Sequence, residues 1–166
     1  MAAKEFVNVY KIGLKIDKEC EIYDAKITSA EKATEIINVV FELNQEAVEK
    51  LGVITLTDDY KVAGLHVIAV GSKNCAYVEE KDMFVPAMLN NSELIILFHN
   101  HPSGNPRPSF QDVVLTEESV KFGDRYGIKV FDHIIVADDK YHSMRDNKNV
   151  DFTKKIIKSK YDKLFE

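Results

Sequence analysis

Apolar residues along the chain show two spacings, and each spacing predicts a different kind of element. Residues 51–56 and 62–70 are rich in β-branched and other apolar residues, and the turn formers Asp58 and Asp59 lie between them. These two runs predict a hairpin. Residues 94–98 are apolar at every position, which is typical of a strand covered on both faces. We therefore expect that strand in the centre of a sheet.

A first helix is expected after residue 28. Thr28 and Glu31 fit a capping box, in which Thr28 caps the helix and Glu31 reaches back to it. The residues that follow repeat at helical spacing, so the helix should end near Glu49. The predicted inward face consists of Ile37, Val40, Phe41, Asn44 and Val48.

Two further helices are expected in the middle of the chain. Residues 79–91 form one of them, and Pro86 either kinks it or marks its true start. Residues 109–126 form the other, which Gly127 should close.

The remaining elements complete a mixed sheet with helices against it, an α/β fold of the α+β kind. Residues 129–136 and 141–144 read as the last strands. Residues 7–16 alternate partly between apolar and polar, as a half-exposed strand would. Residues 152–164 are expected to form a terminal helix.

The composition and charge of the chain exclude several classes of function. The 166 residues suit one domain, and 22 basic against 27 acidic residues give a net charge of −5, which argues against a broad nucleic-acid surface. Cys20 and Cys75 are too few for a disulfide framework or a cysteine-based zinc site. No stretch reads as a signal peptide or a membrane span, so a cytoplasmic location is expected by default.

The informative motif is His99-Asn-His101-Pro, followed by Ser109 and Asp112. Side chains two apart in a strand share a face, so both imidazoles can point at one ion. Asp112 falls in the first turn of the predicted third helix. On a helical wheel it shares a face with Leu115, Ser119, Phe122 and Tyr126.

Two His and one Asp would give three protein ligands for zinc and leave the fourth tetrahedral position for water. An open position distinguishes a catalytic zinc site from a structural one. Taken separately, the parts have plainer explanations. A lone His-x-His is often incidental, and Ser109 with Asp112 could merely cap a helix.

The motif resembles the JAMM motif of the JAB/MPN+ metalloproteases. The wider string His99-Asn-His-Pro-Ser-Gly104, with Asp132-His-Ile-Ile-Val136 downstream, is similar specifically to the RadC branch. The resemblance implies a zinc ion held by His99, His101 and Asp112. It also implies a Glu that acts on the zinc-bound water, and a Ser109 hydroxyl that hydrogen-bonds the developing oxyanion.

In the RadC pattern the catalytic Glu precedes, by seven residues, a Leu that closes the first strand of the hairpin. Counting back from Leu56 gives Glu49, with Glu46 and Glu42 as alternatives. Asn100 is interpreted as setting loop geometry, without a part in the chemistry.

The resemblance also suggests a division of the chain. Residues 1–27 would be an N-terminal strand extension, residues 28–150 the RadC-like JAB/MPN domain, and residues 151–166 a C-terminal helix. The helix-hairpin-helix module of full-length RadC proteins has no counterpart here. Among the other histidines, His133 is expected in the core with its hydrogen bonds satisfied, and His66 at the surface.

Two functions follow as hypotheses. The first is a zinc hydrolase that acts on a peptide or isopeptide bond. The alternative is a non-catalytic accessory module associated with DNA repair or processing, although the acidic charge does not favour DNA binding. An intact but unused metal site is a third reading. The sequence does not specify the substrate or the oligomeric state.

Overall fold

Five strands form one mixed sheet in the order β2-β1-β3-β4-β5. The computed structural model describes residues 13–71 and 78–153. The strands are β1 (Lys50–Leu56), β2 (Val62–Val70), β3 (Leu94–Asn100), β4 (Lys129–Ala137) and β5 (Lys140–Ser143). β3 lies antiparallel to β1 and parallel to β4. The predicted hairpin and the predicted central strand are both confirmed.

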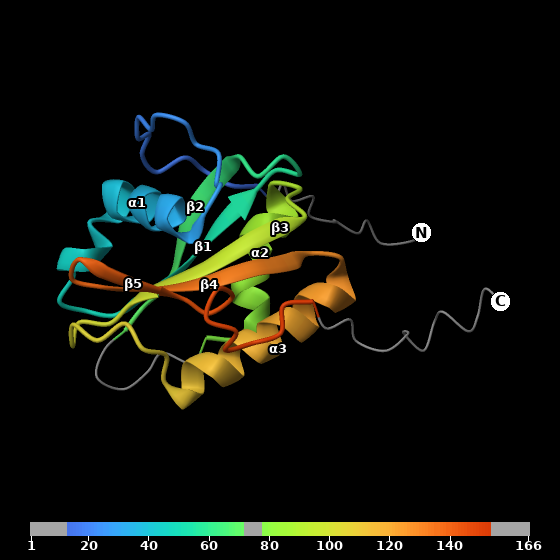
Figure 1. Cartoon of the computed structure of the whole chain (residues 1–166). Helices are drawn as coiled ribbons and strands as arrows, with labels where there is room; N and C mark the ends of the chain where they lie inside the picture. The colour runs from blue at the N-terminus through green and yellow to red at the C-terminus, as the bar shows by residue number, and fades with distance from the viewer. Residues whose placement is uncertain (1–12, 72–77, 154–166) are drawn as a thin grey trace, which may run out of the picture.

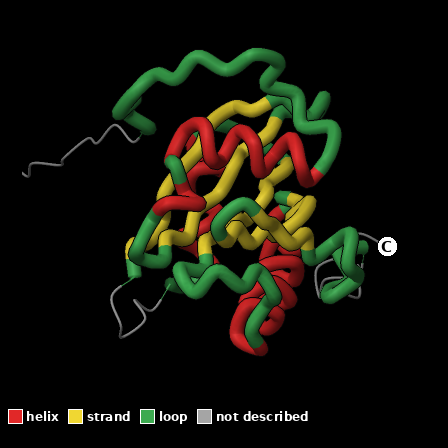
Figure 2. Tube along the Cα trace, turned by 60° about the vertical axis from the view of Figure 1, so that its left-hand side comes forward, coloured by secondary structure: helices red, strands yellow, loops and turns green. Residues whose placement is uncertain are grey.

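Helices cover both faces of the sheet and give one α+β domain (Figure 1). The helices are α1 (Ala30–Phe41), the short 3-10 helix η1 (Leu43–Gln45), α2 (Glu80–Leu89) and α3 (Phe110–Tyr126). α1 lies across one face, and α2 and α3 lie on the other (Figure 2). Each face has its own apolar core, so the sheet is buried on both sides, as its continuous apolar runs predict.

The side chains of β3 alternate between these two cores. Leu97 packs in the core beneath α2 and α3, whereas Phe98 packs in the core beneath α1. Because a strand repeats every two residues, His99 continues the first side and Asn100 the second. His99 therefore lies on the side of the sheet that α2 and α3 cover, and Asn100 lies on the side of α1.

The first helix differs from its prediction at both ends. Ser29, one residue after Thr28, is the N-cap, and its hydroxyl accepts a hydrogen bond from the backbone N–H of Lys32. The helix ends at Phe41, because Glu42 adopts a left-handed conformation with φ of 49°. The burial of Leu43 and the hydrogen bonds described below hold the following segment against the sheet, and these outweigh its helical spacing.

The second helix begins at Glu80, and Pro86 lies inside it as a buried residue. Pro86 therefore does not mark the start of the helix. The third helix is as predicted, with Ser109 as its N-cap and Gly127 in the left-handed conformation at its end.

The predicted terminal elements fall largely outside the described residues. Residues 7–12 of the expected first strand lie there, and residues 13–16 form no strand. Of the expected last helix, residues 154–164 lie outside, and residues 152–153 form a turn. Within the described ranges, no helix is long and apolar enough to cross a bilayer.

Candidate metal centre

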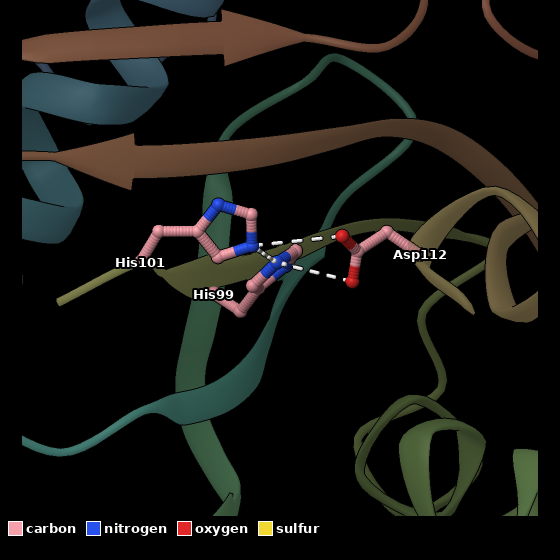
Figure 3. A group of neighbouring side chains, drawn as sticks. All are labelled: His99, His101 and Asp112. Atoms are coloured by element: carbon pink, nitrogen blue, oxygen red, sulfur yellow. Dashed lines mark hydrogen bonds and ion pairs between the residues drawn. The ribbon is translucent and has the colours of Figure 1, made fainter. Parts of the chain in front are cut away.

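The structure brings together His99, His101 and Asp112, the three residues that the motif predicts as ligands (Figure 3). The Nε2 atoms of His99 and His101 lie 2.9 Å apart. His99 Nε2 lies 3.3 Å from Asp112 Oδ1, and His101 Nε2 lies 3.5 Å from Asp112 Oδ2. Two imidazole nitrogens and one carboxylate therefore face one another from the end of β3 and the start of α3.

Asp112 is placed by the capping box of α3. Its carboxylate accepts a 2.6 Å hydrogen bond from the backbone N–H of Ser109, and the Ser109 hydroxyl accepts one from the N–H of Asp112. The capping interaction fixes the side-chain rotamer and leaves the Oδ1 atom facing His99. Asp112 thus serves both the helix end and the candidate site.

The inward direction of Asp112 and Ser119 is confirmed, whereas the other predicted members of that face are less buried than expected. The buried residues of α3 are Asp112, Thr116, Ser119, Val120 and Gly123. Leu115 and Phe122 are only half-buried, and Tyr126 is exposed. Gly123 lies on the buried side because the backbone approaches closely there: a Cβ at this position would lie 2.2 Å from the carbonyl oxygen of Ile128.

His101 is held in place just beyond the strand. Its backbone N–H donates to the carbonyl of Val136 at 2.8 Å, and its carbonyl accepts from the N–H of Gly104. Its ring Nδ1 lies 2.8 Å from the carbonyl oxygen of Asn105, which can only accept a hydrogen bond. The Nδ1 atom of His101 must therefore carry a proton, so in the neutral imidazole the Nε2 atom presents a lone pair to the site.

These atoms fit zinc. A tetrahedral zinc ion with ligands at about 2.0–2.1 Å holds those ligands roughly 3.3–3.4 Å from one another. Here the two histidine Nε2 atoms lie 2.9 Å apart, and each lies within 3.5 Å of a different oxygen of the Asp112 carboxylate, so the spacing of the side chains is close to that of a zinc site. The His101 lone pair and the Asp112 carboxylate are both electron-rich, so a cation between them removes their mutual repulsion.

Burial and the close contacts among these three side chains shift their pKa values. Burial lowers the pKa of His99 to about 4, whereas the hydrogen bond with Asp112 raises the pKa of His101. Burial alone would raise the pKa of Asp112, but its interactions with His101, His99 and Ser109 hold it well below its usual range. The Asp112 carboxylate is therefore ionised and available as a ligand at neutral pH.

Glu49 lies beside this cluster. β1 pairs Leu51 with His99, and the same antiparallel register brings residue 49 level with residue 101. Partial desolvation raises the pKa of the Glu49 carboxyl, the charge of His101 lowers it, and the Asp112 carboxylate raises it. The side chain still reaches solvent.

The two alternatives to Glu49 have different surroundings. Glu46 forms an ion pair with Lys50, the first residue of β1. Glu42 occupies the left-handed position that ends α1. Of the three glutamates, Glu49 is therefore the one whose carboxyl interacts with the candidate ligands His101 and Asp112.

Comparison with known proteins agrees with this geometry. The family model of the RadC-like JAB domain matches residues 27–149. This chain belongs to that family. A UPF0758 protein of Alkaliphilus oremlandii is 31% identical over 146 residues, which cover 88% of this chain and 62% of the relative. A UPF0758 protein of Methanosarcina mazei is 29% identical over 145 residues, covering 87% of this chain and 62% of that relative. The chain thus spans about three-fifths of the curated relatives it matches.

Asn100 of this RadC-like JAB domain contributes more to the structure around the site than the sequence suggested. Asn100 belongs to β3 and is buried, and its amide makes three hydrogen bonds to the segment that carries Glu49. Its nitrogen donates to the carbonyls of Glu46 and Val48, and its oxygen accepts from the N–H of Lys50. The interpretation of Asn100 as a loop residue is therefore wrong. Its position two before the end of the His-Asn-His-Pro string carried no signal of which segment it would meet.

The other histidines lie where their surroundings satisfy them. His133 is fully buried and hydrogen-bonded through both ring nitrogens, as expected of a core histidine. His66 is half-buried and lies 3.3 Å from the hydroxyl of Thr55, so the expectation of a surface position holds only in part.

Proposed function

We propose that this RadC-like JAB domain is a zinc-dependent hydrolase of the metallopeptidase or isopeptidase type. The observation that carries the proposal is the convergence of two imidazole nitrogens and one ionised carboxylate, with Glu49 on the β1 side and Ser109 on the α3 side. When bound, zinc supplies a Lewis acid that lowers the pKa of a coordinated water to about 7 and polarises a substrate carbonyl.

Glu49 is the proposed general base. Its carboxylate takes one proton from the attacking water, whose oxygen forms the new bond to the carbonyl carbon of the amide. As the carbon–nitrogen bond breaks, Glu49 returns this proton to the leaving amine. The products are an amine and a carboxylic acid, and the acid then loses its own proton to solvent. The raised pKa of Glu49 suits a group that must both accept and donate a proton.

Ser109 is the proposed oxyanion donor. Its oxygen accepts the capping hydrogen bond from the Asp112 N–H, and a hydroxyl that accepts in this way still has its own proton to donate. Ser109 is exposed to solvent, so a substrate can reach it. A hydrogen bond from Ser109 to the carbonyl oxygen would strengthen as negative charge develops there.

Two measurements on one pair of proteins test the proposal. Elemental analysis gives the zinc content of the purified chain and of Glu49→Gln, and an unbiased peptide library reports bond cleavage by each. We expect both proteins to hold zinc and only the parent to cleave, with at least a 100-fold loss of rate in the variant. A Glu49→Gln variant as active as the parent would remove Glu49 from the scheme.

The alternative of a DNA-associated accessory module makes a different prediction. Such a module would bind single- or double-stranded DNA with an affinity that falls as salt rises. The net charge of −5 leads us to expect no such binding. A fluorescence titration of labelled DNA at two salt concentrations distinguishes the two functions.

A further inference from the structure

Behind the metal centre, three buried side chains form a continuous line of hydrogen bonds. His99 Nδ1 lies 2.8 Å from His133 Nε2, and His133 Nδ1 lies 2.6 Å from the hydroxyl of Thr116. Thr116 is fully buried on α3, four residues after Asp112. The line therefore runs from the first proposed ligand through β4 to the helix that carries the third.

The direction of these hydrogen bonds follows from Thr116. Its oxygen lies 2.6 Å from the carbonyl oxygen of Asp112, which has no proton to give. A hydroxyl has one proton, so that proton must lie between Thr116 and the carbonyl. The thioether of Met144, at 3.4 Å, is a weaker acceptor and also donates nothing.

Because the Thr116 proton is used in this way, His133 Nδ1 must donate to the Thr116 oxygen. A neutral imidazole with a proton on Nδ1 has a lone pair on Nε2. His133 Nε2 is therefore an acceptor, and His99 Nδ1 must donate to it. The remaining nitrogen of His99, Nε2, then presents its lone pair to His101 and Asp112.

We propose that His133 and Thr116 are positioning residues that hold His99 in its Nδ1–H tautomer, so that its Nε2 lone pair faces the metal centre. The proposal rests on the proposed zinc function and deepens it. Ligand histidines generally donate their second N–H to a carboxylate, a carbonyl or water. Here a second buried histidine takes that place, and the backbone carbonyl of Asp112 itself sets the direction.

The first test uses the parent protein without zinc. The nitrogen-15 shifts of an imidazole ring report which nitrogen carries the proton, so NMR at neutral pH identifies the tautomer of His99. We expect the Nδ1–H tautomer at both His99 and His133. An Nε2–H tautomer at His99 would overturn the proposal, whatever the protein does with zinc.

The second test is zinc affinity, measured by competition with a chelator. Thr116→Val removes the hydroxyl with little change of shape, and we expect zinc to bind about 10- to 100-fold more weakly. Thr34→Val is the matched control, because buried Thr34 also donates to the carbonyl four residues before it, in α1 and away from the site. Thr34→Val should bind zinc as the parent does, and Thr116→Ser should restore the parent affinity.

The outcomes separate this proposal from the function on which it rests. A parent protein that binds no zinc would refute the proposed function, and the NMR result would still decide the tautomer. A parent that binds zinc while Thr116→Val binds it equally well would refute the positioning role. Thermal unfolding of the three variants checks that each is folded.

Discussion

The side-chain oxygen of Asn100 accepts a 2.7 Å hydrogen bond from the backbone N–H of Lys50, the residue that follows Glu49. The nitrogen of the same amide donates to the carbonyl of Val48, the residue that precedes Glu49. Asn100 thus holds the backbone on both sides of the proposed base. Since Asn100 lies between His99 and His101 in sequence, one strand end positions the two proposed histidine ligands and the proposed base.

Replacing Asn100 should affect the base more than the metal. Asn100→Ala removes three hydrogen bonds to partly buried backbone groups, and we expect it to lower the free energy of unfolding by about 1–3 kcal/mol. It should keep zinc and lose turnover, because Glu49 is no longer held. Urea unfolding, elemental analysis and the peptide assay measure the three effects.

Asn147→Ala is a matched control for that variant. Asn147 also ties its side-chain nitrogen to a backbone carbonyl, that of Ser143, outside the metal centre. It should keep the activity of the parent. Equal losses of activity in the two asparagine variants would show that Asn100 acts only through general stability.

The two roles of Ser109 can be separated by the choice of substitution. Ser109→Ala removes an N-cap and should cost about 1 kcal/mol of stability, whereas Ser109→Gly should cost only a few tenths. Both variants lose the hydroxyl, so both should lose about 100- to 1,000-fold in turnover if Ser109 donates to the oxyanion. Activity that follows stability, with Ser109→Gly close to the parent, would assign Ser109 to capping alone.

Much of the fold can be read from the sequence because local patterns and tertiary structure agree. The hairpin, the central strand and the third helix each combine a clear period with strong end signals, such as Ser109 and Gly127. The first helix shows where this agreement fails. Apolar residues continue at helical spacing past Phe41. The segment after Glu42 does not continue the helix, because hydrogen bonds from the distant Asn100 hold its backbone against the sheet.

The residues of the candidate site also fall into those that the sequence could predict and those that it could not. His99, His101 and Asp112 could be found because their spacing and the strand–loop–helix order are local features. The parts of Asn100, His133 and Thr116 could not be found, because each contacts a segment distant in sequence. Whether His133 supports a ligand or only fills the core depends on β4 lying beside β3, and the sequence shows no direct sign of that pairing.

Asp132 should give the chain a measurable pH dependence. Burial raises the pKa of this carboxyl, and nearby Asp146 raises it further, while Ser143 and the backbone N–H groups of His133 and Arg145 oppose the rise. The folded state then holds the proton more tightly than the unfolded state. The stabilisation that Asp132 provides is complete below its unfolded-state pKa of about 3.9. It is lost as the pH rises through the raised pKa of Asp132 in the folded state.

Asp132→Asn should remove that contribution. Its free energy of unfolding, measured in urea over a series of pH values, should decline less than that of the parent as the pH rises from about 4. Asp138→Asn, at an exposed position after β4, is the control and should follow the parent. Parallel curves for Asp132→Asn and the parent would contradict a raised pKa at Asp132.

Zinc binding by the purified chain tests the central claim most directly. Elemental analysis and calorimetric titration of the zinc-free protein should give one zinc ion per chain for the parent and for His66→Ala, a change at a half-buried histidine of β2 outside the site. His101→Ala should lose that ion. A parent that takes up no zinc, or a His101→Ala variant that binds zinc as tightly as the parent, would contradict the account.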